Sequence, residues 1–273
     1  MNRARKRTDL DDDPLAVYRD VRWDRKALSD SRHFIAEGRL CVQRLLQSDL
    51  PVESILVAQG REAEAAGWCS QPTPIYSLPT DEMRSLVGFD FHRGFMACGV
   101  RPDIKTAETR DLHDATGRLG LAAMHVAERE NLGSMMRSAA AFGVDTILLG
   151  PGTADPFSRR VIRVSMGTVF RLKLLRMEQP IEQLALFQAG GVRAIATSLA
   201  ETATSLDRFQ RDTEPYLLLM GNEAGGLSEE VRAMADHELK IPMKMGIDSL
   251  NVGVAAAVFL FALRPDSDTK SDA

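Results

Sequence analysis

Hydrophobic and polar positions in the first third of the chain change spacing every few residues, as expected of short alternating helices and strands. Apolar residues at helical spacing predict a helix over residues 31–46, and another helix begins at Thr80 and ends near Gly88. Compact apolar runs predict strands at residues 52–57, 74–78 and 95–100. These elements indicate an α/β unit of about 80 residues, an ordinary size for a small domain.

The second half of the chain has a more regular pattern, in which apolar strands alternate with helices. Strands are predicted at residues 121–126, 146–149, 172–177, 193–197, 216–220 and 239–241. The intervening helices imply a largely parallel sheet that is covered on both faces. Residues 101–117 are rich in charges and poor in apolar side chains, as expected of a linker. The predicted organisation is a disordered tail (1–20), a small α/β domain (21–103), a linker (104–117), a larger α/β domain (118–265) and a second tail (266–273).

Composition indicates a soluble globular protein. The chain of 273 residues is 44% hydrophobic and 26% charged, and its net charge is −4, so any nucleic-acid site must be a local basic patch. Cys41, Cys69 and Cys98 form no CxxC pair, and the five histidines lack ligand spacing. We therefore expect a cytoplasmic protein with no disulfide and no metal. The longest apolar run, residues 252–263, is too short to cross a bilayer, so no membrane span is expected.

A local basic patch lies in the first part of the larger domain. Residues 128–176 contain eight lysines and arginines and four acidic residues, which gives a local formal charge of +4. Asp155 is predicted to cap a helix whose first position is Pro156. A solvated helix face is one interpretation of the basic residues that follow, and contact with nucleic-acid phosphates is the other. The second interpretation assigns that contact to Arg159, Arg160 and Arg163.

Three polar segments beside predicted strands carry the candidate chemistry. The first is Glu-Asn-Leu-Gly-Ser-Met-Met-Arg at 130–137, and the second is Gly-Asn-Glu-Ala-Gly-Gly-Leu at 221–227. The third joins Ile-Pro-Met at 241–243 to Ser-Leu-Asn-Val at 249–252. An α/β enzyme assembles one site from several loops at the carboxyl ends of its strands, so we expect the three segments to meet.

The first segment is predicted to be a loop that leads into a helix. Asn131 offers donors and an acceptor on a short side chain, and Gly133 permits backbone geometry that a side chain would obstruct. Arg137, one turn into the helix, can hold a phosphate or a sugar edge through its planar guanidinium group. A purely structural interpretation makes these residues a helix cap, a turn residue and a surface charge.

The other two segments favour a ligand that is not an isolated phosphate. The Gly-Lys-[Ser/Thr] ending of a phosphate loop is absent after Gly221, and Glu229 and Glu230 in the next helical turn would repel a phosphate. A neutral or cationic ligand suits this loop better. In the third segment, the apolar side chains and backbone groups near Ile241 and Leu250 are suited to a purine ring.

Together the three segments resemble the three motifs of the SpoU (TrmH-like) RNA ribose 2′-O-methyltransferases of the SPOUT class. The resemblance implies an α/β fold with a trefoil knot in its parallel-sheet domain, S-adenosyl-L-methionine as the cofactor, rRNA or tRNA as the substrate, and a homodimer. The final helix, apolar on nearly all sides over residues 252–261, is consistent with a dimer interface. The chain departs from the family pattern at Ala224 and Gly253, where glycine and serine are usual.

A looser resemblance covers the smaller domain. Residues 34–38, 54–57 and 92–98 are similar to the RNA-binding domain, related to a ribosomal protein, that precedes many SpoU domains. Residues 21–103 are therefore expected to bind the RNA substrate.

The family resemblance also implies roles for individual residues. The expected catalytic residues are Asn131, Arg137, Glu223, Ser249 and Asn251. The expected cofactor-binding residues are Gly221, Asn222, Ile241, Met243 and Leu250. In the family the arginine that matches Arg137 is proposed to take the proton. Because a guanidinium group stays charged, we expect Arg137 instead to hold the adjacent phosphate and stabilise the developing alkoxide.

Two other functions remain open from the sequence. A nicotinamide-dependent oxidoreductase is disfavoured because Gly-Pro-Gly at 150–152 lacks the third glycine and the helix of a dinucleotide fingerprint. A non-catalytic RNA-binding protein of the same fold is the second alternative, since a fold can persist without its chemistry. Binding of S-adenosylmethionine separates the methyltransferase from both.

Overall fold

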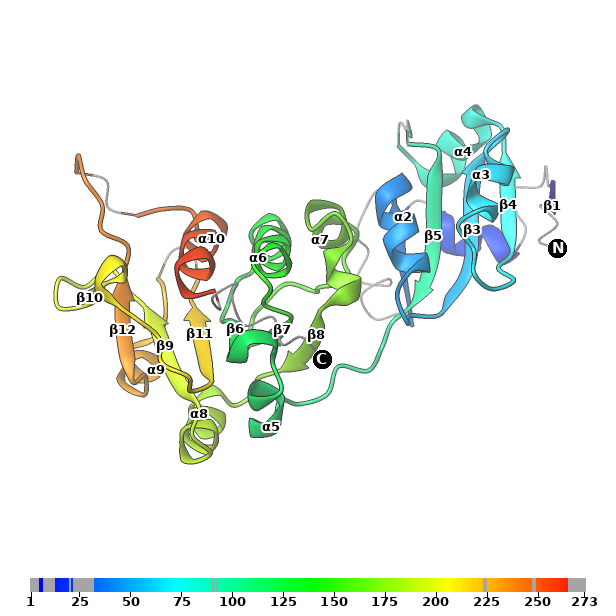
Figure 1. Cartoon of the computed structure of the whole chain (residues 1–273). Coiled ribbons are helices and arrows are strands. Elements are labelled where there is room, and N and C mark those ends of the chain that lie inside the picture. The colour runs from blue at the N-terminus through cyan, green and yellow to red at the C-terminus, as the bar shows by residue number, and fades with distance from the viewer. Residues whose placement is uncertain are drawn as a thin grey trace. The chain divides into compact units, whose positions relative to one another are not determined.

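The computed structural model describes residues 5–6, 13–19, 21, 32–89, 91, 93–222, 225–246 and 249–264. The contacts divide the chain into two compact units, drawn in Figure 1. The first unit comprises Met1–Asp103 and Asp155–Phe170, and the second comprises Ile104–Ala154 and Arg171–Ala273. The segment Asp155–Phe170, which the sequence analysis placed within the larger domain, thus packs with the first unit.

Five strands form the sheet of the first unit, in the order β1-β4-β3-β5-β2. They are β1 (Arg5–Lys6), β2 (His33–Glu37), β3 (Val52–Ala58), β4 (Ile75–Leu78) and β5 (Phe95–Val100). β5 pairs antiparallel with β2 and β3, whereas β4 pairs parallel with β3 and β1. The three strands predicted in this part of the chain are confirmed as β3, β4 and β5.

The helix predicted over residues 31–46 is wrong in its first half. His33–Glu37 is strand β2, and the helix that follows, α2, spans only Arg39–Leu46. The run Phe34-Ile35-Ala36 is buried throughout, and a short apolar run of this kind fits a helix or a strand equally well. Pairing with β5 makes it a strand. Gly38, with a φ of +93°, turns the chain between strand and helix in a conformation that side chains disfavour.

The remaining helices of the first unit complete its core. They are η1 (Asp13–Tyr18), α3 (Glu62–Ala66), α4 (Thr80–Val87), α7 (Arg159–Val164) and most of η3 (Thr168–Arg171). Buried residues of η1, α4 and the sheet form one hydrophobic cluster that includes Leu15, Leu56, Met83 and Met96. The disordered tail predicted over residues 1–20 is therefore wrong for η1, which packs into the core. Gly88, with a φ of +77°, ends α4 as predicted.

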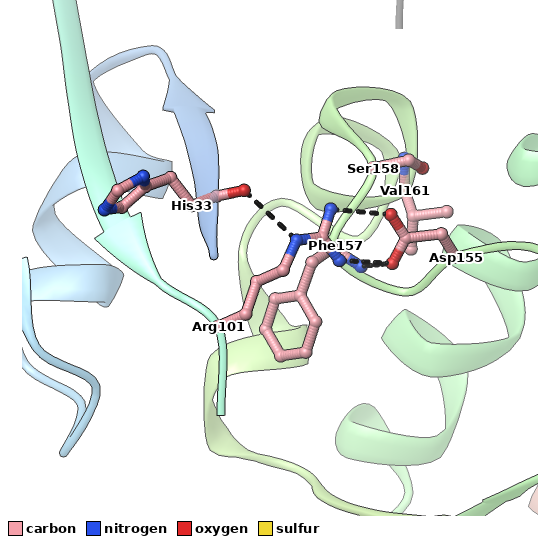
Figure 2. Close-up of polar contacts among 6 residues, drawn as sticks. All are labelled: His33, Arg101, Asp155, Phe157, Ser158 and Val161. Atoms are coloured by element: carbon pink, nitrogen blue, oxygen red, sulfur yellow. Dashed lines mark hydrogen bonds and ion pairs between the residues drawn. The ribbon is translucent and has the colours of Figure 1, made fainter. Parts of the chain in front are cut away.

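The segment Asp155–Phe170 is held in the first unit by aromatic and charged contacts. The Phe34 ring lies 5.1 Å from that of Phe157 and 5.4 Å from that of Phe170. Arg101 donates two hydrogen bonds of 2.8 Å to the carboxylate of Asp155 (Figure 2). Asp155 was predicted to cap the helix, but Ser158 is the N-cap and α7 begins at Arg159. Asp155 still accepts a hydrogen bond from the amide of Phe157 at 3.0 Å, but the turn that it closes does not continue into the helix, which begins only at Arg159.

The second unit contains a seven-stranded sheet in the order β10-β12-β9-β11-β6-β7-β8, in which every pairing is parallel. The strands are β6 (Leu119–Ala123), β7 (Thr146–Leu149), β8 (Lys173–Arg176), β9 (Arg193–Thr197), β10 (Thr204–Ser205), β11 (Tyr216–Met220) and β12 (His237–Lys240). Six of these correspond to predicted strands, which confirms the parallel sheet. β10, of two residues, was not predicted because so short a strand leaves no periodic pattern.

Helices cover both faces of this sheet. They are α5 (Thr109–His113), η2 (Thr116–Arg118), α6 (Arg129–Ala141), α8 (Pro180–Ala189), η4 (Leu206–Arg208), α9 (Glu229–Ala233) and α10 (Val252–Leu263). Figure 1 shows α5 and α8 on one side of the sheet and α6 and α10, side by side, on the other. Leu112 of α5 and Phe187 of α8 share a hydrophobic cluster with Leu217 and Leu219 of β11. The expected linker, residues 104–117, thus contains the folded helix α5.

Helix α10 is apolar on almost every side but is not fully covered within one chain. Val254, Val258 and Phe261 are 51%, 37% and 54% exposed, while Ala256 and Leu260 are fully buried. In the part of the chain that the structure describes, neither α10 nor any other helix has the length and hydrophobicity required to cross a membrane.

Candidate functional site

A cavity of about 620 Å³ opens where several strands of the second unit end. It is lined by residues that follow β9, β11 and β12 and by the first turns of α10. Seven of the predicted site residues line it: Gly221, Asn222, Ile241, Met243, Ser249, Leu250 and Asn251. The second and third polar segments therefore meet as expected, because neighbouring parallel strands end at one edge of the sheet.

The loop after β11 is closed by its own backbone. The amide of Asn222 donates to the carbonyl of Gly226, and the amide of Gly226 donates back to the carbonyl of Asn222, each at 3.0 Å. The Asn222 side chain accepts a hydrogen bond from the Gly225 amide and donates one to the carbonyl of His125. Glu223 and Ala224 lie outside the described residues.

Gly221 has no room for a side chain in this closed loop. A Cβ atom at this position would lie 2.2 Å from the carbonyl carbon of Gly226 and 2.3 Å from the nitrogen of Leu227. By contrast, a Cβ atom at Gly225 would meet nothing within 4 Å. The glycine at 221 thus lets the strand end pass directly against the returning loop, and this close approach shapes one wall of the cavity.

Asn251 connects the third polar segment to the first. Its side-chain oxygen accepts hydrogen bonds from the amides of Gly253, at 2.9 Å, and Val254, at 3.3 Å, so Asn251 is the N-cap of α10. Its side-chain amide donates to the Oδ1 atom of Asn131 at 2.8 Å. Asn131 in turn donates to Glu128 at 3.2 Å. A hydroxyl residue before the last helix also suits an N-cap, and the sequence allows that interpretation of Ser249, but the structure gives the role to Asn251.

The first segment differs from its prediction in local structure. Helix α6 begins at Arg129 with Glu128 as its N-cap, so Asn131 and Gly133 lie in the helix and not in a loop. Asn131 is 4% exposed, whereas Arg137 is exposed on the same helix and is not among the residues lining the cavity. α6 packs beside α10, and a Cβ atom at Gly253 would lie 3.1 Å from that of Ser134. Glycine at position 253 therefore suits the close approach of these two helices.

The structure adds residues that the sequence analysis missed. The residues that follow β9, from Thr197 to Ala200, line the cavity together with Met220 and Phe259. Thr197 donates to the carbonyl of Leu219 on the neighbouring strand. No glycine or polar motif marks this segment, and only the strand order, with β9 between β11 and β12, could have indicated it.

The cavity is nearly uncharged. Among the described residues that line it, Arg232 alone carries a formal charge, and its guanidinium group lies 3.3 Å from the carboxylate of Glu238. The remaining lining consists of apolar side chains, hydroxyl and amide groups, and glycine backbone. Such a site suits a ligand with a flat, largely apolar ring and a few polar edges.

Comparison with known proteins relates this chain to RNA methyltransferases. Residues 118–261 match the SpoU rRNA Methylase family. The chain is 33% identical, over 83% of its length and 79% of the relative's, to an uncharacterized tRNA/rRNA methyltransferase of Mycobacterium tuberculosis. It is 29% identical, over 88% of its length and 92% of the relative's, to the 23S rRNA (guanosine(2553)-2′-O)-methyltransferase RlmP of Bacillus subtilis.

Solved structures extend the relationship to both units. The chain superposes on an AdoMet-bound rRNA methyltransferase from Sinorhizobium meliloti with a TM-score of 0.81 and 25% identity, covering 95% of this chain and 97% of the other. The SpoU methyltransferase AviRb from Streptomyces viridochromogenes, at 22% identity and a TM-score of 0.76, shares the fold. On the strength of the family match and of the relatives that span most of its length, this chain belongs to the SpoU rRNA methylase family.

Proposed function

We propose that this protein transfers a methyl group from S-adenosylmethionine to a ribose 2′-oxygen of RNA. The observation that carries the proposal is the cavity of the second unit, which gathers seven predicted site residues from the second and third polar segments. The relative RlmP is named for 2′-O-methylation of 23S rRNA, which supports both the reaction and the substrate class.

The lining of the cavity fits this cofactor. When bound, S-adenosylmethionine supplies an electrophilic methyl group on a sulfonium centre. Ile241, Met243 and Leu250 offer apolar surface to its adenine ring, and the loop from Gly221 offers backbone groups to its polar edges. Arg232 repels a cation, but Glu238 pairs with it, so the lining opposes a sulfonium less than an unpaired arginine would.

We assign the chemistry to Arg137, supported by polar residues around it. Arg137 holds the phosphate next to the target ribose and stabilises negative charge that develops on the 2′-oxygen, because its guanidinium group remains charged. The Asn131–Asn251 hydrogen bond fixes α6, which carries Arg137, against the start of α10. Ser249 faces the cavity, and Glu223 is kept as a catalytic residue on the family resemblance alone.

The first unit binds the RNA in this proposal, and an edge of its sheet has suitable chemistry. Three arginines lie where β2 ends, where β3 ends and where β5 begins: Arg39, Arg61 and Arg93. Their side chains are 62%, 47% and 51% exposed. The guanidinium group of Arg39 lies over Trp68, 5.6 Å from the ring centroid, and that of Arg61 lies over Phe95 at 5.1 Å. Preorganised guanidinium groups beside an aromatic ring suit both phosphates and unstacked bases.

The arginines of helix α7 are a second candidate RNA surface. Arg159 donates to Glu37, a carboxylate that is 4% exposed, at 2.9 Å, and it also lies over the ring of Phe89 at 4.5 Å. These contacts favour a positioning role for Arg159. Arg160 and Arg163, both half-buried on α7, are kept as phosphate contacts.

A homodimer through α10 accounts for the apolar side chains that one chain leaves exposed. Val254, Val258 and Phe261 are spaced by four and three residues and therefore share one helix face. A second copy would cover this face, and Val258→Glu should then shift the protein to monomers in sedimentation experiments. The matched control is Leu186→Glu on α8, because Leu186 is 65% exposed but lies on another helix. A dimer that survives Val258→Glu would exclude this interface.

The trefoil knot and the cytoplasmic location complete the proposal. After β11 the chain crosses to β12, beyond β9, and then returns to place α10 beside α6. This return path is the kind of crossing that a knot requires. The proposed substrates, rRNA and tRNA, place the enzyme in the cytoplasm.

The experiment that tests the function is methylation of RNA by the purified protein. Total rRNA and tRNA from a strain that lacks the gene are incubated with labelled S-adenosylmethionine, and the labelled nucleosides are identified by mass spectrometry. We expect label in one 2′-O-methylnucleoside of either RNA class. Label on a base would reject the ribose as acceptor, and RNA binding without transfer or cofactor binding would support the non-catalytic alternative.

A further inference from the structure

Three side chains with metal-binding chemistry meet in the first unit, and none of them is among the residues that line the cavity of the second unit. They are the imidazole of His33 on β2, the carboxylate of Glu53 on β3 and the thiol of Cys98 on β5. One ligand atom from each lies within 4.8 Å of the others. The Nε2 atom of His33 is 2.9 Å from a carboxylate oxygen of Glu53. No sequence spacing brings these residues together, because they come from three separate strands.

The pairing of the strands explains the cluster. Cys98 lies on β5, between β2 and β3 in the sheet, directly opposite Ile35 on one side and Ser54 on the other. His33 lies two residues before Ile35 on β2, so its side chain points to the same side of the sheet as those of Ile35 and Cys98. The register of β3 shifts between Val52 and Ser54, so Glu53 is the extra residue of a bulge. A bulge re-aims side chains, and here it brings the Glu53 carboxylate to the face that holds His33 and Cys98.

The surroundings hold these residues in place. The hydroxyl of Tyr18, fully buried, donates to the carbonyl of Ser54 at 3.0 Å and also contacts its side-chain oxygen at 2.8 Å. This contact fixes the strand next to the bulge. Arg101 donates to the backbone carbonyl of His33 at 3.1 Å, while the imidazole points away from the Arg101–Asp155 pair (Figure 2). The imidazole is thus anchored through its backbone and directed towards β5.

We propose that His33, Glu53 and Cys98 form a binding site for a zinc-class divalent ion that joins the three strands of the first unit. Thiolate and imidazole ligands favour Zn²⁺ or Co²⁺ over Mg²⁺ and Ca²⁺, which prefer oxygen. Three protein ligands leave a fourth, tetrahedral position for water. The Nε2 atom of His33 would bind the ion in place of its present contact with Glu53.

Binding requires a small adjustment and the loss of one proton. Tetrahedral Zn–N, Zn–O and Zn–S bonds of about 2.0–2.3 Å place ligand atoms roughly 3.3–3.8 Å apart. The 2.9 Å contact between His33 and Glu53 must therefore open to admit the ion. His33 and Glu53 can supply the movement, because their side chains are 30% and 52% exposed. The Cys98 thiol must lose its proton to solvent on binding. Burial raises the pKa of this thiol to about 12, so an ion must replace the proton to make the thiolate.

The test uses Co²⁺ as a spectroscopic probe of the full-length protein. Thiolate ligation gives a charge-transfer band in the near ultraviolet, and tetrahedral Co²⁺ gives visible d–d bands. We expect one equivalent of Co²⁺ to produce both, Zn²⁺ to abolish both by competition, and Zn²⁺ to raise the melting temperature. Cys98→Ser should remove the charge-transfer band, and His33→Gln or Glu53→Gln should weaken binding by about 10-fold or more.

Cys69→Ser is the matched control, since Cys69 is the most accessible of the three thiols and, among the residues that the structure describes, belongs to no cluster of metal-binding side chains. It should leave the bands unchanged. Circular dichroism on each variant shows whether the fold is intact. If Cys98→Ser fails to fold, His33→Gln and Glu53→Gln, which change more exposed side chains, still test the site. No charge-transfer band in the wild type, or a band that disappears in Cys69→Ser and survives in the cluster variants, would overturn the proposal. The cluster would then be an ion pair above a buried thiol.

Discussion

The cofactor cavity of the second unit and the arginine edge of the first unit are built from opposite kinds of residues. The cavity uses glycine backbone, apolar side chains and neutral amides, with Arg232 as its charged residue among those described. The edge places Arg39, Arg61 and Arg93 beside Glu37 and Glu64, and Arg159 of the neighbouring helix α7 also pairs with Glu37, so these six residues together carry a formal charge of +2. A small ligand is selected by close fit, whereas a polyanion is attracted through charge. Ligand binding in the cavity should therefore be sensitive to added atoms, and RNA binding at the arginine edge should be sensitive to salt.

The largest expected effect is at a charge that belongs to neither region. Arg137→Ala should lower the rate of methyl transfer by at least about 10²–10³-fold, because electrostatic stabilisation of the developing alkoxide is lost. Cofactor affinity should remain nearly unchanged, since Arg137 does not line the cavity. Arg137→Lys should rescue little, because a point charge cannot make the paired hydrogen bonds of a guanidinium group. Single-turnover rates and calorimetry measure the two quantities. Full activity of Arg137→Ala would reject the assignment.

A single methyl group in the wall of the cavity should have the next largest effect. Gly221→Ala places a Cβ atom 2.2 Å from backbone of the returning loop, which must move and deform the site. We expect cofactor affinity to fall by about 10-fold or more. Gly225→Ala, with open space around the added atom, is the control and should bind normally. A cofactor affinity of Gly221→Ala equal to that of the unchanged protein would show that this wall does not shape the site.

The arginine edge should respond to charge and salt instead. Reversal of Arg39, Arg61 and Arg93 to glutamate should weaken RNA binding, and the slope of log affinity against log salt should fall by about 0.7–0.9 for each lost phosphate contact. Cofactor affinity should not change. Arg84→Glu on α4 is the control for each of the three single reversals, which change the charge by the same amount, and Arg160→Glu with Arg163→Glu tests the other candidate surface. If only the α7 pair alters the slope, the RNA surface lies on that helix.

The smallest expected effect is on stability. Asn251→Ala removes the N-cap of α10, which costs about 1 kcal/mol, and the hydrogen bond to Asn131, which costs about 1 kcal/mol more. Asn251→Asp keeps the capping oxygen but cannot donate to Asn131, so it should keep the stability that comes from the N-cap and lose the stability that comes from the hydrogen bond to Asn131. Urea unfolding measures both. Equal losses in the two variants would mean that the cap contributes nothing.

The elements that the sequence predicted correctly are those with a local cause. Strands such as Tyr216–Met220 are buried on both faces and appear as apolar runs, and Gly88 ends a helix by its own conformation. The failures have distant causes. His33–Glu37 is a strand because β5 pairs with it, and α7 begins later than predicted, after Asp155 and Phe157 have made contacts with Arg101 and Phe34. In the site, the motifs located the loops after β11 and β12, but Thr197–Ala200 enters through strand order alone.

The packing of Asp155–Phe170 against the first unit has a consequence for synthesis on the ribosome. Phe34 is covered by Phe157 and Phe170, so the first unit lacks part of its core until the chain has been made beyond Asp103 as far as Phe170. At about 5–20 residues per second, this interval lasts several seconds. During that time β6 and β7 of the second unit are already emerging. The two units therefore cannot fold strictly one after the other, and a nascent chain paused in this interval exposes an aromatic surface for chaperones to protect.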